Sequence, residues 1–596
     1  MADKNDSNLD FSEREALLFH SHGRPGKIEI IASKPMATQR DLSLAYSPGV
    51  AVPVRAIAED PAKAYDYTAK GNLVAVISNG TAILGLGNLG ALASKPVMEG
   101  KAVLFKRFAD VDAIDLELNT EDTEAIINAV QIMEPSFGGI NLEDIGAPDC
   151  FVIEQTLRDR MNIPVFHDDQ HGTAIIAAAG IINACLLTDR KIEDIKVVVN
   201  GAGAAAIACA SLIKSLGVPH DNLTMCDRTG VIYRGRDDVD QWKSAHAIDT
   251  DTRTLTEALS GADVFLGLSA GGALKQEMVK DMAPQPIIFA MANPDPEITP
   301  PDAKAARPDA IIATGRSDYP NQVNNVIGFP FIFRGALDVR ATRINEEMKV
   351  AAAHAIAELA REQVPEEVAV AYGGKAPSFG VDYIIPAPFD PRLMDVVSAA
   401  VAKAAMDSGV AQKPIEDFDA YRQALKARLN PTTSVLTQAY EACRVAPKRI
   451  IFAEAEEDVV LRAAIQFQDG GYGTPVLVGR DDRVRAKLME LGVTDPDRFE
   501  VHNSRNSPLV PDMVNMLYER LHRRGYMERD IKRMVNQDRN IFGSAMLAMN
   551  QGDAMITGVT RPYAQSFRDV VKVIDVEKGR TALGIHVMVG QHHTVF

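Results

Sequence analysis

The hydrophobic positions in the middle of this 596-residue chain form short continuous runs, each followed by a loop of small or polar residues. The runs are Lys196–Asn200, Leu223–Asp227, Ala262–Gly267, Pro286–Ala292 and Ala310–Ala313. Continuous apolar runs of this length are typical of strands buried on both faces of a parallel sheet. The pattern therefore predicts an α/β fold with a doubly wound, Rossmann-like sheet.

The first two runs frame a candidate nucleotide-binding loop. A glycine-containing turn follows the first strand and leads into helix-forming residues 207–216, and the second strand ends in an acid. Glycines at such a turn let the backbone approach a pyrophosphate at the helix N-terminus, and the acid can bond a ribose 2′-hydroxyl. An ordinary strand–turn–helix of small residues is the alternative. The predicted cofactor-binding positions are Gly201, Ala202, Gly203, Ala204, Ala205, Ala206, Asp227 and Arg228.

A second glycine-rich stretch lies earlier in the chain and is a weaker candidate. Leu73–Ser78 and Thr81–Leu84 are apolar runs on either side of Asn79–Gly80, a dipeptide typical of hairpin turns. The formal GxGxxG motif Gly85–Gly90 follows directly. A nucleotide fingerprint is expected between a buried parallel strand and a helix, whereas this one would follow a hairpin and precede Pro96. We therefore expect the later loop to bind the cofactor.

Two adjacent carboxylates, Asp168 and Asp169, precede the apolar helical segment Ala174–Leu187. One interpretation is that one acid caps the helix and the other faces water. A second pair of acids, Glu143 and Asp144, follows another strand-like run. Four acids at the ends of two strands would repel each other strongly if they converged without a cation. We therefore expect a site for a hard divalent ion such as Mg²⁺ or Mn²⁺, which prefers oxygen ligands.

Composition and charge argue against several classes of partner. The chain has 63 basic and 80 acidic residues, a net charge of −17, which argues against nucleic acid or an anionic membrane as a partner. The N-terminus has no signal-peptide core, and the longest apolar run, about 13 residues, is too short to span a bilayer. No CxxC spacing occurs, so we expect the cysteines to be reduced core residues of a cytoplasmic protein; they are Cys150, Cys185, Cys209, Cys226 and Cys443.

Eight motifs stand in the order found in malic enzymes of the long bacterial form, in which a malic-enzyme body is fused to a phosphotransacetylase-like region. They are Tyr46–Gly49, Gly85–Gly90, Glu99–Lys101, Leu142–Asp144, Phe166–Thr173, Gly201–Ala205, Asn293–Pro294 and Gly315–Asn325. The chain resembles this family over residues 12–430. The resemblance implies oxidative decarboxylation of (S)-malate to pyruvate and CO2 with reduction of a nicotinamide cofactor, and oxaloacetate decarboxylation as a further activity.

The resemblance also assigns roles to individual residues. It implies that Glu143, Asp144 and Asp169 hold the metal ion. Lys101 matches the acceptor of the substrate 2-hydroxyl proton, and Asp168 would position it, whereas a lone lysine here would ordinarily face solvent. A nearby dication and partial burial would lower the pKa of this lysine toward a useful range.

Three further residues complete the expected site. Tyr46 matches the donor of the proton that converts the enolate to pyruvate. Asn293 and Asn325 lie in loops after strands, where their amides would hold the substrate carboxylate or, for Asn293, the cofactor; a plain turn role is the alternative for each. Residues Thr81–Ile83 stand where vertebrate-type enzymes carry an arginine, so other groups must bind the substrate carboxylate here.

The sequence contains opposing signals for the nicotinamide cofactor. Asp227 favours NAD, because a carboxylate there would repel a 2′-phosphate. Arg228, with Arg234 and Arg236 nearby, can instead hold the 2′-phosphate of NADP. Long fused enzymes of this family more often prefer NADP, so we predict NADP, with NAD as the alternative.

The C-terminal part resembles phosphotransacetylase. A strand at Arg449–Glu457, a helix at Val459–Gln468 and a strand at Thr474–Gly479 are expected to form an α/β unit. That family's Pro-Glu-Gly-Glu reads Ala453–Glu456 here, and its second lobe, which supplies much of the coenzyme A and phosphate site, is missing. Acetyl transfer is therefore not expected, and the region would instead serve assembly or bind an acetyl-CoA effector.

The expected organisation has a malic enzyme N-terminal catalytic domain at 1–165 and a Rossmann-like NAD(P)-binding domain at 166–430. A linker at 431–447 leads to a partial phosphotransacetylase-like domain at 448–596. We expect a homo-oligomer that binds small molecules and has no nucleic-acid or membrane partner.

Overall fold

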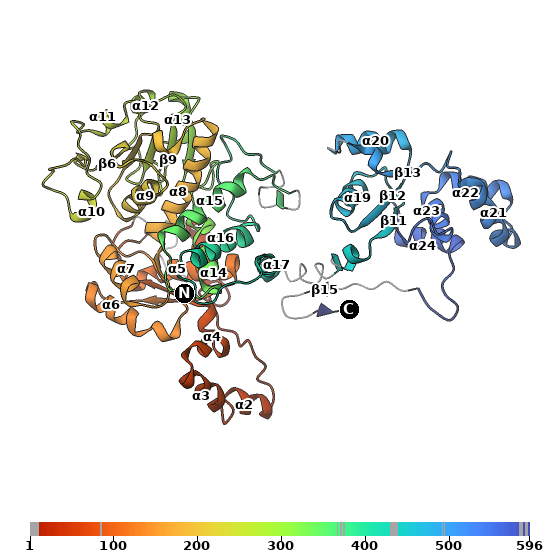
Figure 1. Cartoon of the computed structure of the whole chain (residues 1–596), viewed down its shortest axis with the longest axis horizontal. Coiled ribbons are helices and arrows are strands. Elements are labelled where there is room, and N and C mark those ends of the chain that lie inside the picture. Colours follow the sequence, from red (N-terminus) through yellow and green to blue (C-terminus); the bar gives the residue numbers. More distant parts are fainter. Residues whose placement is uncertain are drawn as a thin grey trace. The chain divides into compact units, whose positions relative to one another are not determined.

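The structure is a computed structural model, and it divides into two compact units, Met1–Leu429 and Asn430–Phe596 (Figure 1). The described residues are 11–83, 86–365, 368–369, 372, 376–429, 439–440, 442–491, 493, 495–582, 588–589 and 594–595. Each unit is built around its own α/β sheet or sheets.

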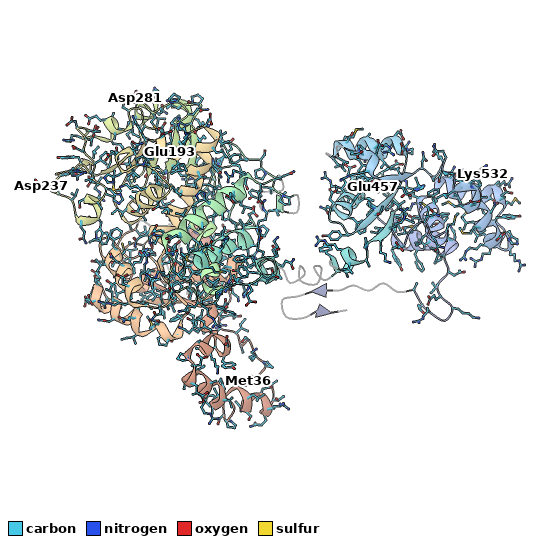
Figure 2. All side chains as sticks on the ribbon, viewed as in Figure 1. Met36, Glu193, Asp237, Asp281, Glu457 and Lys532 are labelled. Atoms are coloured by element: carbon cyan, nitrogen blue, oxygen red, sulfur yellow. The ribbon has the colours of Figure 1, made fainter. Side chains whose placement is uncertain are left out.

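The first unit begins with helices that bury little of their surface. They are α1 Phe11–Ser21, α2 Gln39–Ala45, α3 Ala51–Glu59 and α4 Ala64–Tyr67. None of α2, α3 and α4 contains a buried residue. Met36, labelled in Figure 2, lies just before α2 and is 56% exposed, so apolar side chains of this segment face solvent.

A four-stranded parallel sheet in the order β2-β1-β3-β4 follows. Its strands are β1 Leu73–Ser78, β2 Asp112–Glu117, β3 Gly139–Leu142 and β4 Val165–His167. The helices between them are α5 Ala91–Ala109, α6 Thr123–Ile132 and α7 Asp149–Arg160. Because the strands are parallel, the residues that follow β3 and β4 emerge at the same edge of the sheet.

The expected hairpin around Asn79–Gly80 is wrong. β1 pairs in parallel with β2 and β3 and is almost completely buried, so tertiary pairing overrides the local turn signal. The stretch Gly85–Gly90 therefore lies between a buried parallel strand and α5, and α5 continues through Pro96. Both structural grounds for dismissing that stretch are incorrect, although Gly85 itself lies outside the described residues.

The second sheet of the first unit has six strands in the order β10-β9-β8-β5-β6-β7. They are β5 Val197–Asn200, β6 Leu223–Asp227, β7 Gly230–Val231, β8 Val264–Gly267, β9 Ile287–Ala290 and β10 Ile311–Thr314. Only β7 is antiparallel to its neighbour among these strands. Its connecting helices are α9 Ala204–Ser215, α10 Gln241–Ser244, α11 Leu255–Leu259, α12 Gln276–Lys280 and α13 Pro300–Ala306. The Rossmann-like sheet predicted from the five apolar runs is confirmed.

Helix α8, Asp168–Leu187, joins the two sheets and forms the centre of the unit's core. Around it lie α9 and α15 (Glu346–Arg361), with α14 Phe329–Asp338, α16 Leu393–Asp407 and α17 Phe418–Leu429 completing the unit. By length and composition α8 could cross a membrane, but 78% of its apolar window is buried inside the protein. The helix has 20 residues, longer than expected, because it begins at Asp168.

The second unit contains a four-stranded parallel sheet in the order β13-β12-β11-β14. Its strands are β11 Lys448–Phe452, β12 Gly473–Val478, β13 Glu500–His502 and β14 Ala554–Ile556. Its helices are α19 Asp458–Asp469, α20 Asp481–Glu490, α21 Val510–Leu521, α22 Glu528–Gln537, α23 Arg539–Ala548 and α24 Tyr563–Val573. The expected strand–helix–strand start of this region is confirmed.

Four of the cysteines are buried, as expected for core residues: Cys150, Cys185, Cys209 and Cys226. Burial raises the pKa of each of these thiols to about 12, which keeps them protonated at neutral pH. Cys443 is exposed, so the prediction that it belongs to the core is wrong.

Candidate active site

Four acidic residues meet at one edge of the first sheet. Glu143 and Asp144 follow β3, and Asp168 and Asp169 form the first turn of α8, directly after β4. β3 pairs with β4, with Leu142 opposite His167, so the two acidic pairs lie side by side. The backbone N–H of Asp144 donates a hydrogen bond of 2.8 Å to Oδ2 of Asp169. The convergence predicted from the strand ends is therefore present.

Lys101 supplies the positive charge of this cluster. It lies on the buried face of α5, and its side chain is 9% exposed. Its Nζ atom is 2.6 Å from Oδ2 of Asp168 and 2.8 Å from Oε1 of Glu143. The ammonium also lies 4.1 Å from the ring centroid of Phe329, a cation–π distance. The solvent-facing alternative for this lysine is thereby excluded.

Charge balance sets the protonation of the cluster. Burial lowers the pKa of Lys101, but the charges of Asp168, Glu143 and Asp169 outweigh it and raise this pKa above its ordinary value. Two carboxylates contact the ammonium directly here, whereas the expected lowering of this pKa refers to a lysine beside a bound dication and stays a prediction. Burial raises the pKa of Glu143 well above its usual range; Lys101 opposes that shift, and Asp169 and Asp168 reinforce it.

Asn325 joins this cluster from a segment later in the chain, between β10 and α14. It begins the short helix η7, Asn325–Ile327, and its Nδ2 donates to Oδ2 of Asp168 at 3.1 Å. Its Oδ1 accepts a hydrogen bond of 3.1 Å from the hydroxyl of Thr173, which fixes the orientation of the amide. The structure thus brings the predicted residues Asp168 and Asn325 together.

A close backbone approach holds Asp168 in place. A Cβ atom at Gly172, one helical turn later, would lie 2.1 Å from Oδ1 of Asp168 and 3.0 Å from Cγ of Asn325. Real Cβ atoms essentially never come so close to another atom. Only glycine therefore fits between the acid and the amide.

Two further residues, Asn141 and Phe329, support the cluster and were not predicted from the sequence. Asn141, buried in β3, donates from Nδ2 to Oε2 of Glu143 at 2.8 Å, so both carboxylate oxygens of Glu143 are engaged. Phe329 faces Lys101 from α14. Asn141 could have been found from the sequence, because it is a polar residue in an otherwise apolar strand, two residues before Glu143. No local feature of the sequence distinguishes Phe329.

The donor set of this cluster fits a hard divalent ion, since the side chains offer carboxylate oxygens only. Glu143 and Asp169 carry charges close enough to influence Lys101 and each other. Among the described residues, however, no group of three or more histidine, cysteine, aspartate or glutamate side chains has the arrangement of a metal site. In this arrangement the Lys101 ammonium contacts Asp168 and Glu143 and offsets one negative charge of the cluster.

Two predicted residues are not brought to the cluster. Tyr46 ends α2, and its side chain is 71% exposed. Asn293 follows β9, is exposed, and lies beside Gly315, where an added Cβ would be 3.1 Å from its Oδ1. No hydrogen bond within the described residues joins either side chain to Lys101 or to the four acids.

The predicted dinucleotide loop has the expected strand–turn–helix geometry. β5 leads through Gly201–Gly203 into α9. Gly201 has φ of +132°, and a Cβ there would lie 2.3 Å from the carbonyl oxygen of Leu268, so this position requires glycine. The turn therefore brings the loop tightly against the end of β8.

The acid at the end of β6 is already neutralised. Nη2 of Arg236 lies 2.8 Å from each carboxylate oxygen of Asp227, and Thr229 donates its backbone N–H to the same group. Burial raises the pKa of Asp227, but these hydrogen bonds outweigh it and lower this pKa below its ordinary value. Arg228 is exposed and forms no ion pair with any carboxylate in the described part of the chain.

Comparisons with known proteins agree with this architecture. The family model for the malic enzyme N-terminal domain matches residues 25–158, the malic enzyme NAD binding domain matches 170–371, and phosphate acetyl/butaryl transferase matches 434–596. An NADP-dependent malic enzyme of Rhizobium meliloti is 61% identical over 98% of this chain and 77% of its own length. An NAD-dependent malic enzyme of the same organism is 49% identical over 95% of this chain and 74% of its own length. The crystal structure of malic enzyme from Pyrococcus horikoshii is 41% identical, with a TM-score of 0.64 over 72% of this chain and 96% of that one. The chain therefore belongs to the malic enzyme family.

Proposed function

We propose that this chain catalyses the oxidative decarboxylation of (S)-malate to pyruvate and CO2, with reduction of NADP. The observation that carries the proposal is the buried Lys101, held between Asp168 and Glu143 at the edge where β3 and β4 end. A buried base beside several carboxylates suits removal of a hydroxyl proton next to a bound cation. The malic enzyme family model and the relatives support the reaction class.

Lys101 takes the proton of the malate 2-hydroxyl in this proposal. It can do so only after giving up a proton of its own, since its two carboxylate contacts favour the ammonium. Asp168 and Asn325 position Lys101 through a continuous hydrogen-bonded path, Thr173 to Asn325 to Asp168 to Lys101. Substrate binding must displace Glu143 from the lysine, which leaves Asp168 as its remaining acidic contact.

Glu143, Asp144 and Asp169 would hold Mg²⁺ or Mn²⁺. A bound ion would polarise the developing ketone and stabilise the enolate that remains after CO2 departs. The side chain of Asp169 is 38% exposed and can turn toward a ligand, whereas Glu143 must first exchange Lys101 and Asn141. The chain's own contribution is a set of three anionic oxygen donors on adjacent strand ends.

Tyr46 would return the proton to the enolate, and its exposure indicates that the segment around it docks during catalysis. The helices α2 to α4 contain no buried residue but present Leu44, Val52 and Val54 to solvent, at 64%, 64% and 59% exposure. Exposed apolar residues this dense are typical of an interface. We propose that this segment packs on a second copy of the chain, so that the active enzyme is a homo-oligomer.

Two observations favour NADP over NAD. Arg236 neutralises Asp227, which weakens the repulsion that this acid would exert on a 2′-phosphate. Arg228 is exposed and unengaged within the described residues, so its guanidinium is available for bidentate phosphate contacts. Asn293 would contact the cofactor or substrate from the loop after β9.

The second unit is proposed as a binding module for a phosphate-bearing effector such as acetyl-CoA. Three arginines surround the single carboxylate of Glu456: Arg480 at 3.3 Å, Arg483 at 3.5 Å and Arg539 at 3.3 Å. One carboxylate neutralises one of these charges, so the cluster keeps an excess of positive charge for an anion.

The test of the proposed reaction is malate-dependent NADPH formation with Mg²⁺ or Mn²⁺ present and after removal of metal with EDTA. We expect NADPH to form together with equimolar pyruvate, and only when metal is present. Pyruvate formation without NADPH, or activity unaffected by EDTA, would contradict the proposal.

A further inference from the structure

A cavity of about 500 Å³ lies behind the first turn of α8 and is lined by residues of α7, α9, α10 and α15. These four helices are labelled in Figure 1. None of the residues of the Lys101 cluster lines it, and neither does the dinucleotide loop Gly201–Ala206. α9 faces the cavity with residues of its second and third turns, well past the helix N-terminus. The cavity is therefore separate from the site of the proposed reaction.

The inner wall of this cavity is a buried row of polar side chains. Glu154 accepts hydrogen bonds of 3.0 Å from the backbone N–H of His167 and 2.9 Å from Nε2 of His171. Because the carboxylate accepts, Nε2 carries the hydrogen, and Nδ1 of a neutral His171 can accept from Nζ of Lys349 at 3.4 Å. Lys349, with a side chain only 5% exposed, also pairs with Glu346.

This wall leaves donors without a protein acceptor. An ammonium has three hydrogens, and within the described residues Lys349 directs only two of them, to His171 and Glu346. Gln170, 4% exposed, also lines the cavity, and its buried Nε2 donates no hydrogen bond within the described residues. Buried donors are ordinarily satisfied, so unsatisfied ones beside a cavity point to a ligand that accepts hydrogen bonds.

The donors at the mouth favour an anion. Arg158 and Arg343 line the cavity and form no ion pair with a carboxylate in the described part of the chain. The formal charges of the lining balance, with Glu154, Asp159 and Glu346 against Arg158, Arg343 and Lys349. The two guanidinium groups nevertheless offer N–H donors that an anionic ligand can accept from.

The remaining wall is apolar. It is formed by Phe151, Ala174, Ile207, Ala208, Leu212 and Trp242. The rings of Phe151 and Trp242 pack with their centroids 4.8 Å apart, which gives this wall a rigid flat surface. A ligand that fills the cavity must therefore combine a hydrogen-bond-accepting anionic head with an apolar body.

We propose that this cavity binds a small organic acid, with its carboxylate between Arg158, Arg343 and Lys349 and its apolar body against Trp242 and Phe151. Gln170 and His171 directly follow Asp168 and Asp169, so the ligand contacts the helical turn that carries the catalytic acids. No residue of the proposed reaction takes part in this binding.

Trp242 is the single tryptophan of the chain, so its fluorescence reports on this cavity without background. The probe is 3-phenylpropionate, titrated into the full-length protein, with 3-phenylpropanamide as its uncharged counterpart and acetate and inorganic phosphate as anions without an apolar body. We expect a saturable change of Trp242 emission with 3-phenylpropionate alone. An equal response to the amide, or to phosphate or acetate, would overturn the proposed ligand class.

Variants locate the binding. Arg158→Gln should weaken it about ten- to a hundredfold, since it removes a hydrogen bond to a charged group. Arg160→Gln, an exposed arginine of the same helix α7 outside the lining, is the matched control and should bind as the wild type does. Ser211→Phe, which places a ring in the cavity from the exposed side of α9, should abolish the response while malate turnover persists. The proposal would be overturned if the wild type gave no saturable response. It would also be overturned if Arg158→Gln and Ser211→Phe both bound 3-phenylpropionate as tightly as the wild type.

Discussion

The Nζ atom of Lys101 lies 2.6 Å from Oδ2 of Asp168, although 67 residues separate them in the chain. The contact joins α5, which follows the central strand β1, to the first turn of α8, which follows the edge strand β4. A buried lysine is tolerated here because carboxylates meet it on two sides. The pair therefore connects α5, which packs on the first sheet, to the acids at the carboxyl edge of that sheet.

Asp169→Asn tests the metal site. Loss of one anionic donor should leave the fold intact and raise the Mg²⁺ or Mn²⁺ concentration for half-maximal activity, with turnover reduced at least ~100-fold. Activity measured against metal concentration, with thermal unfolding measured in parallel, checks this. Asp281→Asn, at an exposed position labelled in Figure 2, is the control. Wild-type turnover of Asp169→Asn at saturating metal would show that the site is misassigned.

Lys101→Ala and Tyr46→Phe test the two proton transfers. Each should reduce malate turnover about 10²–10⁴-fold, because each removes a proton-transfer group. Tyr46→Phe should spare hydride transfer more than enolate protonation, measurable as NADPH formed faster than pyruvate in a single turnover. Trivial effects of both substitutions would contradict these roles.

Mixing the same two inactive variants tests whether Tyr46 acts across an interface. If the α2–α4 segment of one copy completes the site of another, mixed dimers contain one intact site, and random mixing should restore about a quarter of wild-type activity. An affinity tag on one variant shows the exchange, because the untagged variant is then recovered together with it after mixing. Complete exchange without recovered activity would place Tyr46 and Lys101 in the same copy.

Arg228→Ala tests the cofactor assignment. Loss of a charged contact to the 2′-phosphate costs ~1.5–3 kcal/mol, so kcat/KM for NADP should fall roughly ten- to a hundredfold, with little change for NAD. Lys280→Ala, which removes an exposed cation of α12, is the control. A wild type that prefers NAD and is indifferent to Arg228→Ala would show that Asp227 decides the choice.

Removal of the second unit tests the independence of the first. A chain ending at Leu429 contains both sheets of the first unit and all residues of the Lys101 cluster. It should retain malate-dependent NADPH formation and lose any effector response mediated by residues 430–596. A folded truncated protein without activity would show that the second unit completes the active site.

His246 makes stability depend on pH. Burial, together with the charges of Lys214, whose Nζ is 3.0 Å from Nδ1, and of His220, lowers the pKa of His246 to about 4. Between pH ~6.5 and about 4, His246 is therefore protonated in the unfolded state and neutral in the folded state. The contribution of this residue to the free energy of unfolding is fully present above that window and is lost as the pH falls through it. The urea midpoint should fall less between pH 7 and pH 5 in His246→Gln than in the wild type. Equal shifts would contradict the assignment.

Continuous apolar runs predicted the second sheet correctly, because strands such as β5 and β8 are buried on both faces and contain few polar residues. Acids after β3 and β4 likewise predicted the edge where the four carboxylates converge, since parallel strands share one carboxyl edge. The hairpin at Asn79–Gly80 failed because a local turn signal does not reveal the parallel neighbours of β1. The direction of the pKa shift of Lys101 in the absence of metal could not be predicted, because it depends on the distances to Asp168 and Glu143, which no spacing in the sequence supplies.

Gly172 has no side chain, and Asp168 occupies the space beside its Cα where a Cβ would lie. Alanine is normally the most favourable residue in a helix, so a methyl group at this position would stabilise an isolated α8. In the folded protein the same methyl would occupy the volume that Oδ1 of Asp168 now fills, and the acid would have to leave both Lys101 and Asn325. Gly172→Ala should therefore lower both turnover and the stability of the folded protein, because the buried Lys101 would lose a carboxylate partner.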